Sequence, residues 1–308
     1  MEDYYFLNYD CLSCFHISEF KIYNQILLIN KSFFSNINNL NHLQIFYNVC
    51  DSSVCVNINI LQKLTSLKLI SKKYLNLRID YICCPLLQKL KISKCKSLAN
   101  FECVMLLQNV CDLNISNLSL SIDVLNKFSK LTRLIFHMHE NDNDKFYILN
   151  CLSSLVKLKI RTVNYMLQNI EHKSLINLKS LTINVIYNRN IRSILIKYPN
   201  LTHLKICIFG GLVGKHCSAN LSSQINLISL KILYMKINCM NFYLMQAINL
   251  RILKLYGLRG CDYNLWLHNR YNCKLRYLKI QAFDYIKLDN MTNLKTKILY
   301  NVKTITEL

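Results

Sequence analysis

The sequence predicts an α/β solenoid: a curved horseshoe with a parallel β-sheet on its concave face, short helices or 3₁₀ turns on its convex face, and a helical N-terminal cap. Three observations lead to this fold class. The hexad L-x-x-L-x-[L/I/F] recurs about every 23 residues over most of the 308-residue chain. Apolar and polar residues alternate in each hexad, as in a strand with one buried face. Glycine and proline are scarce, with 5 and 2 copies, which disfavours folds built on many tight turns.

Twelve hexads align along the chain, 19 to 26 residues apart. They start at Leu40, Leu64, Leu87, Val110, Leu131, Leu155, Leu178, Leu201, Leu227, Leu250, Leu275 and Leu294. Asparagine stands directly before seven of them, and it suits the turn that precedes a strand. One unit is too short to bury its own leucines, so the units must stack and their strands must pair in parallel. Residues 39–308 are therefore expected to hold about 11–12 repeats.

The repeat resembles the leucine-rich repeat family over Asn39 to Leu299. The match is best between Cys84 and Asn117, where four residues fit L-x-x-L-x-L-x-x-[N/C]: Leu87, Leu90, Ile92 and Cys95. Cys84 and Cys111 stand where the cysteine-containing subclass of the family has its helix-ending cysteine. In other units the Asn/Cys position after the strand is held by Met235, Leu258 or Phe283, so an irregular solenoid is expected.

The middle residue of each hexad lies between two inward residues and should point outward from the concave sheet. Seven of these twelve residues are lysines: Lys68, Lys91, Lys159, Lys205, Lys231, Lys254 and Lys279. Arg251 and Arg276 add positive charge at neighbouring positions, and the net charge of +21 favours acidic partners. Two interpretations are open. The lysines belong to a solvated sheet face that keeps the protein soluble, or they dock an acidic partner.

Residues 1–38 break the repeat and are expected to form the helical cap. Two helical stripes occur there: Leu7, Cys11, Leu12 and Phe15, then Ile26, Leu27, Ile29 and Phe33. The segment also resembles an F-box, a helical motif that recruits the adaptor subunit of a cullin-type ubiquitin ligase. This resemblance implies an adaptor-binding role for Leu7, Leu12, Phe15, Ile29 and Phe33. A plain cap over the first strand remains the other interpretation.

Several classes of site and location are not expected. No run of about 18 apolar residues predicts a membrane span, and the acidic N-terminus lacks a secretory signal. The 15 cysteines are then expected to be reduced and mostly buried in an intracellular protein of the cytoplasm or nucleus. Cys11, Cys14 and His16 have a metal-like spacing, but they lie on an apolar stripe and are expected to be core residues.

No catalytic, cofactor or metal site is expected, because no paired carboxylates, nucleophile–base pattern or phosphate loop occurs. The sequence therefore favours a non-enzymatic scaffold that binds an acidic protein through its basic concave face. Its sharper form is the substrate receptor of a ubiquitin ligase. The alternative is a basic protein that binds nucleic acid or anionic lipid. Nucleic acid is disfavoured, because few aromatic residues that might stack on bases accompany the lysines.

Overall fold

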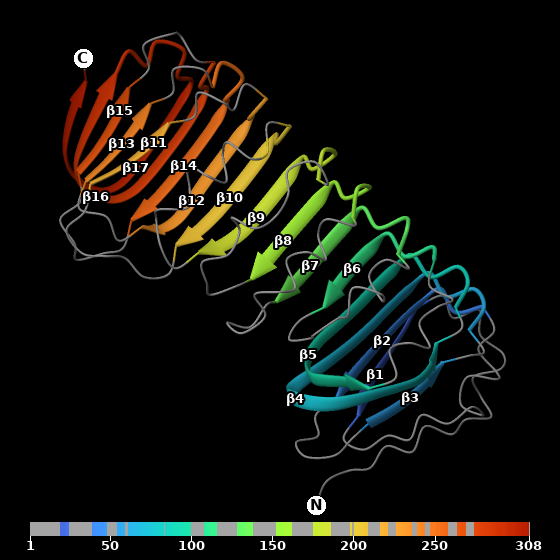
Figure 1. Ribbon diagram of the computed structural model, residues 1–308. Coiled ribbons are helices and arrows are strands. Elements are labelled where there is room, and N and C mark those ends of the chain that lie inside the picture. Colours follow the sequence, from blue (N-terminus) through green and yellow to red (C-terminus); the bar gives the residue numbers. More distant parts are fainter. Residues whose placement is uncertain are drawn as a thin grey trace, which may run out of the picture. The chain divides into compact units, whose positions relative to one another are not determined.

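The computed structural model describes somewhat more than half of the chain as 17 strands with their adjoining turns (Figure 1). The described residues are 19–24, 39–47, 54–58, 61–82, 84–99, 108–115, 128–137, 152–161, 175–185, 198, 200–208, 216–220, 226–235, 239–243, 247–257, 264–268 and 274–307. The chain divides into two compact units, Met1–His137 and Met138–Leu308. Within the described ranges, no helix is long and apolar enough to cross a membrane.

The described residues of the first unit form seven strands. They are β1 (Glu19–Asn24), β2 (His42–Tyr47), β3 (Val54–Ile58), β4 (Ser66–Ile82), β5 (Lys89–Ala99), β6 (Asp112–Ile115) and β7 (Arg133–His137). Six of them pair in parallel in the order β1-β2-β4-β5-β6-β7, and β3 pairs with the second half of β4. The described part of the predicted helical cap, β1, is thus a strand. Both predicted cap helices lie outside the described residues.

In the second unit, the part that the structure describes forms ten strands. They are β8 (Lys157–Arg161), β9 (Ser180–Val185), β10 (His203–Ile208), β11 (His216–Asn220), β12 (Ser229–Met235), β13 (Cys239–Tyr243), β14 (Ile252–Gly257), β15 (Asn264–His268), β16 (Tyr277–Asp289) and β17 (Thr296–Glu307). One parallel sheet runs β8-β9-β10-β12-β14-β16-β17, and we call it the hexad sheet. The segments that start at Leu155, Leu178 and Leu201 therefore lead into adjacent parallel strands, as the repeat predicts.

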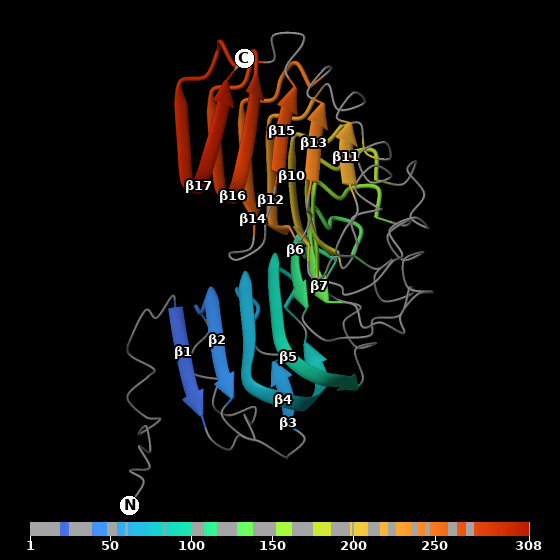
Figure 2. The same ribbon diagram turned by 90° about the vertical axis from the view of Figure 1, so that its left-hand side faces the viewer.

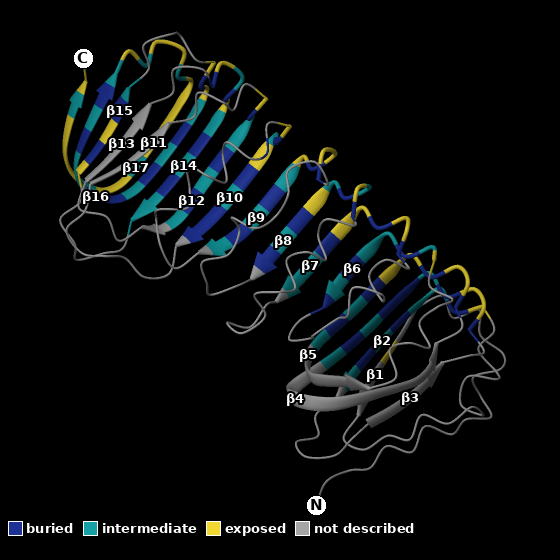
Figure 3. Ribbon diagram, viewed as in Figure 1, coloured by how far each residue is buried: buried dark blue, intermediate teal, exposed yellow. Residues whose placement is uncertain are grey.

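The hexad residues form the core of both units. Every hexad contributes to a strand, and the first apolar residue of eleven hexads is at most 2% exposed. Figure 3 shows the resulting alternation of buried and partly exposed positions along hexad strands such as β10 and β14. The exception is the last hexad, where Leu294 is partly exposed and Lys297 is exposed. Stacked leucines thus replace the compact core of a globular domain, and each turn depends on its neighbours for burial.

A tight turn precedes most hexads and adds a core position that the hexad pattern does not include. The backbone N–H of Leu64 donates to the carbonyl of Leu61 (3.1 Å), and that of Leu87 donates to the carbonyl of Cys84 (3.0 Å). Leu61 and Cys84, each three residues before its hexad, are at most 1% exposed. Cys111 instead follows Val110 and lies at a different position of the repeat. Cys84 and Cys111 are therefore not equivalent.

The described return segments of the second unit form strands. β11, β13, β15 and the second half of β16 pair in parallel, and we call them the return sheet. Figure 2 shows them as a second layer beside the hexad strands. Leu265, Leu267 and Ile286 of this sheet are fully buried. The helices or 3₁₀ turns predicted for the convex face are not among the described residues, whose return segments are extended instead.

Asparagines before the hexads form hydrogen bonds from one turn to the preceding one. The Asn109 Nδ2 atom donates to the carbonyl of Pro85 (2.7 Å), and Asn177 Nδ2 donates to that of Ser153 (2.9 Å). Asn200 Nδ2 donates to the carbonyl of Ile176 (2.9 Å). A ladder of side-chain amides therefore lies before the strands. The sequence pattern led us to expect only turn geometry at this position.

Replacing Asn109 with alanine is expected to lower the free energy of unfolding by about 1 kcal/mol, because the carbonyl of Pro85 loses its donor. Urea denaturation followed by circular dichroism measures this change. Lys130, whose Nζ atom lies 2.7 Å from Asn109 Oδ1, supplies the control. Lys130→Ala removes only an exposed contact and should cost less than about 0.5 kcal/mol. Equal losses of unfolding free energy in the two variants would contradict a stabilising role for the hydrogen bond between Asn109 and Pro85.

Candidate partner-binding surface

Four lysines stand in register on four consecutive strands of the hexad sheet. Lys205 of β10 is the Cα partner of Lys231 of β12, which in turn is the partner of Lys254 of β14. Lys279 of β16 is the next partner. All four are partly exposed, while the leucine or isoleucine on either side of each is buried. We call these four residues the lysine row. Their Cα atoms are spaced by about 4.8 Å, the distance between paired strands.

No carboxylate of the described residues pairs with the lysine row. The three described carboxylates of the second unit contact other side chains: Asp284 pairs with Lys303, Glu307 pairs with Lys297, and Asp289 lies against the imidazole of His268. Partial burial and the neighbouring ammonium groups of Lys205, Lys254 and Lys279 lower the pKa of Lys231. The row is therefore a line of cations that lacks a carboxylate counter-ion within the described structure.

Two tyrosines interleave with the row. The Lys231 Nζ atom lies 5.1 Å from the centroid of the Tyr256 ring, and Lys279 Nζ lies 5.6 Å from the same ring. Lys254 Nζ lies 5.1 Å from the centroid of Tyr277. Such contacts attract a cation to the ring face by about 0.5–1 kcal/mol at exposed sites. The rings thus hold three of the ammonium groups close to the sheet despite their mutual repulsion.

Replacing Lys205 with glutamine is expected to raise the pKa of Lys231 part of the way to its usual value. Burial remains in this variant, but the ammonium group of Lys205, which lowers the pKa most among the neighbouring charges, is gone. Because the folded-state pKa is lowered, the penalty of charging Lys231 persists below that pKa and disappears as the pH rises toward the unfolded-state value. NMR titration of the lysine side chains measures the shift. The control variant Lys274→Gln changes a lysine outside the row and should leave the pKa of Lys231 unchanged.

The first unit carries a second basic cluster on its hexad strands. Lys68 and Lys91 are Cα partners on β4 and β5. They line a hollow of about 170 Å³ together with Lys89, Arg133 and Asp112. Asp112 Oδ2 lies 3.0 Å from Arg133 Nη1, so one of the cations in this hollow is already paired with a carboxylate. The first unit therefore has a more nearly balanced charge at its basic surface than the lysine row has.

The remaining predicted partner-binding residues lie in other places. Lys159 of β8 is separated from the lysine row by Thr182, which is the Cα partner of both Lys159 and Lys205. Arg251 and Arg276 lie at the start of their hexads, in the turns before β14 and β16, and both are exposed. The structure thus places these two arginines at the edge of the sheet and not beside the lysine ammonium groups.

The adaptor-binding residues inferred from the F-box resemblance lie outside the described residues: Leu7, Leu12, Phe15, Ile29 and Phe33. The same holds for Cys11, Cys14 and His16. Among the side chains that the structure does describe, no group of three or more histidine, cysteine, aspartate or glutamate residues is placed to hold a metal ion. Cys84, Cys111 and Cys207 are thiols and form no disulfide.

One more lysine belongs to the outward positions. Lys21 of β1 is exposed and is the Cα partner of Gln44 on β2. The sequence contains the signal for it, because Ile17, Phe20 and Ile22 fit the hexad with larger apolar residues, 23 residues before Leu40. A hexad pattern that allows phenylalanine at its fourth position includes this strand.

Comparison with known proteins gives structural neighbours only. No protein-family model matches the chain, and no curated protein is significantly similar in sequence. A crystal structure of an internalin from Listeria monocytogenes is similar with a TM-score of 0.45 and 16% identity, over 94% of this chain and 82% of the internalin chain. The mouse RP105/MD-1 complex is similar with a TM-score of 0.46 and 14% identity, over 95% of this chain. This chain covers 51%, about half, of that mouse chain.

Proposed function

We propose that the chain is a leucine-rich-repeat-type scaffold that binds an acidic segment of a partner protein along the lysine row. The observation that carries this proposal is the register of Lys205, Lys231, Lys254 and Lys279 without a carboxylate counter-ion in the described structure. Like charges at strand spacing repel each other by about 1 kcal/mol per pair in water. A line of carboxylates on a partner would replace this repulsion with attraction.

A protein partner is favoured over nucleic acid, because the faces of the two tyrosine rings already contact lysine ammonium groups. Proteins that bind single strands without sequence preference stack the bases on aromatic side chains. Here two lysine ammonium groups contact the ring of Tyr256 and one contacts that of Tyr277. Stacking a base on either ring competes with these contacts. Carboxylates need only the ammonium groups, which are partly exposed.

The test compares two variants that lose the same charge. In the first, the four residues of the lysine row are replaced by serine. In the second, four lysines outside the row are replaced by serine: Lys274, Lys287, Lys295 and Lys303. The probe is a fluorescein-labelled decaglutamate peptide, whose binding is measured by fluorescence anisotropy at 50 mM salt. The row variant is expected to bind about 100-fold more weakly than the wild type, and the control variant within about 3-fold.

The other outcomes decide between the alternatives. A single-stranded oligonucleotide or an anionic lipid vesicle that binds more tightly than decaglutamate, with the steep salt dependence of phosphate contacts, would replace the acidic protein as the partner. Wild-type protein that binds none of the three probes would show that the row is a solvated face. Equal losses in the two variants would show that total charge, and not the row, attracts the peptide.

The sharper form of the proposal is an intracellular substrate receptor of a ubiquitin ligase. Its support is the resemblance of residues 1–38 to an F-box, together with the repeat that follows. A pull-down from cell extract with the folded protein should then recover the ligase adaptor, and Leu12→Ala with Phe33→Ala should abolish this recovery. Failure of the wild-type protein to recover the adaptor would reject the ligase role while leaving the scaffold proposal intact.

A further inference from the structure

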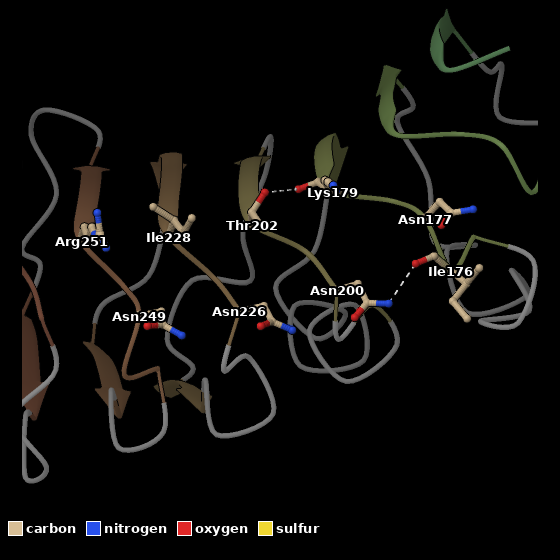
Figure 4. Close-up of a pocket in the computed structure, with 9 residues that line it drawn as sticks. All are labelled: Ile176, Asn177, Lys179, Asn200, Thr202, Asn226, Ile228, Asn249 and Arg251. Atoms are coloured by element: carbon tan, nitrogen blue, oxygen red, sulfur yellow. Dashed lines mark hydrogen bonds between the residues drawn. The ribbon is translucent and has the colours of Figure 1, made fainter.

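A polar groove runs across four successive turns of the second unit, at the edge where the chain enters the hexad strands (Figure 4). Its volume is about 390 Å³. One side carries four asparagines from the position directly before the hexad: Asn177, Asn200, Asn226 and Asn249. The other side carries Lys179, Thr202, Ile228 and Arg251, from the second position of the hexad. We call this feature the asparagine groove.

The carboxamides of the groove are held in place by the fold. Asn177 and Asn200 each donate a hydrogen bond of 2.9 Å to a backbone carbonyl of the preceding turn. This bond uses one N–H of each side chain, and a carboxamide oxygen is a further acceptor. Within the described structure, no residue pairs with the carboxamide oxygen of Asn177 or of Asn200. These two oxygens are therefore oriented acceptors that a ligand can reach.

In the first unit, the corresponding asparagine carboxamide oxygens have lysine partners. There the Lys63 Nζ atom lies 2.7 Å from Asn39 Oδ1, and Lys130 Nζ lies 2.7 Å from Asn109 Oδ1. A lysine of the following turn thus occupies each of these carboxamide oxygens. In the groove, Asn177 is followed one turn later by Asn200, and Asn200 by Asn226, so no lysine from this position faces the carboxamide oxygen of Asn177 or Asn200. The uninterrupted row of carboxamides belongs to the second unit.

Charge and apolar surface narrow the chemistry of the ligand. No carboxylate lines the groove, whereas Lys179 and Arg251, both exposed, stand on its outermost turns. Between these cations lies the side chain of Ile228, and Ile176, at one end of the groove, is 61% exposed. A ligand that fits this lining carries hydrogen-bonding groups along its length, at least one anionic group near an end, and apolar side chains.

The length of the groove corresponds to that of a short peptide. Four turns at a spacing of about 4.8 Å place the first and last asparagines roughly 14 Å apart. An extended chain rises about 3.3 Å per residue, so roughly four to five residues span that distance. Peptide N–H groups are donors for the carboxamide oxygens, and peptide carbonyls are acceptors for the remaining carboxamide N–H groups.

We propose that the asparagine groove binds the main chain of an extended acidic peptide segment from a protein partner. The carboxamides of Asn177 and Asn200 pair with the peptide backbone, while Lys179 and Arg251 bind acidic side chains near its two ends. Ile176 and Ile228 contact apolar side chains. This inference rests on the proposed function only in taking the partner to be a protein. It adds a second contact surface, at the edge of the sheet and separate from the lysine row.

The test uses the defined peptide acetyl-Glu-Leu-Glu-Leu-Glu-amide with a fluorescent label, and the same sequence with N-methylated backbone amides. Both peptides carry the same charges and side chains, so they differ in main-chain donors. The full-length protein is expected to bind the N-methylated peptide at least 10-fold more weakly. Lys179→Gln with Arg251→Gln should weaken binding of the unmodified peptide about 10-fold. The matched control, Lys287→Gln with Lys303→Gln, should change it less than 2-fold.

The variants also separate this inference from the lysine-row proposal. Replacing the four lysines of the row with serine should leave the pentapeptide affinity within about 3-fold of wild type, even if decaglutamate binding is lost. Equal affinity for the N-methylated and unmodified peptides would overturn main-chain recognition. Loss of pentapeptide binding in the row variant, with no effect of Lys179→Gln and Arg251→Gln, would place the peptide on the row and reject the groove.

Discussion

Leu253→Ala is expected to lower the free energy of unfolding by about 3–4 kcal/mol. Leu253 is the middle leucine of its hexad and is fully buried. It stands in register between Leu230 of β12 and Leu278 of β16, both of which are at most 1% exposed. Truncation removes apolar contacts and leaves a cavity that the flanking strands cannot close without breaking their own pairing. The loss of packing therefore destabilises three neighbouring turns of the stack, those of β12, β14 and β16.

Urea denaturation followed by circular dichroism measures this loss, and Lys254→Ala is the matched control. Lys254 is the next residue on the same strand, but it points to the opposite face and is partly exposed. Its replacement should change the free energy of unfolding by less than about 0.5 kcal/mol. A similar cost for both variants, or a loss below about 1 kcal/mol for Leu253→Ala, would contradict the alternation of buried and outward residues in β14.

Ala282→Val is expected to lower the free energy of unfolding by about 2–4 kcal/mol. Ala282 has a φ of 60° and is 8% exposed. It lies where β16 passes from its pairing with β14 to its pairing with β15, and so from the hexad sheet to the return sheet. A β-branched side chain opposes this left-handed backbone conformation and needs more volume than the buried bend provides.

The control at this position is Ala282→Gly. Glycine adopts positive φ without a Cβ clash, which is favourable, but it also makes the unfolded chain more flexible. The two effects nearly cancel, so the free energy of unfolding should change by less than about 1 kcal/mol. Thermal and urea unfolding of the three proteins measure the order. A valine variant as stable as the alanine and glycine proteins would show that this bend is not left-handed in solution.

Local pattern was enough to predict the hexad strands. A strand with one buried face needs alternating apolar residues, and twelve hexads show that alternation in the sequence. Their recurrence predicted parallel neighbours, which the pairing of Lys205, Lys231, Lys254 and Lys279 confirms. The strand Glu19–Asn24 was not predicted, because Phe20 holds the fourth position of its hexad, where leucine is usual.

The return sheet was not predictable from pattern in the same way. The strand Cys239–Tyr243 has no regular leucine alternation, and its extended form depends on parallel partners in β11 and β15. These partners lie roughly a turn of the repeat away in sequence, so no local window contains them. The prediction of helices or 3₁₀ turns on this side relied on the need of each return segment to lead back to the next strand, and that need does not specify pairing between neighbouring turns.

The sequence by itself determined the period of the repeat, the buried leucines, and the outward lysines between them, because each follows from residues within a single hexad. Only the tertiary structure decided which other groups lie beside these lysines and beside the arginines. It placed the ring of Tyr256 against Lys231 and Lys279, and it placed Arg251 beside the asparagines at the sheet edge. The physical reason is that the register between turns arises from backbone hydrogen bonds between residues about 23 positions apart. The sequence of one turn therefore does not show which side chains of the neighbouring turns lie beside it.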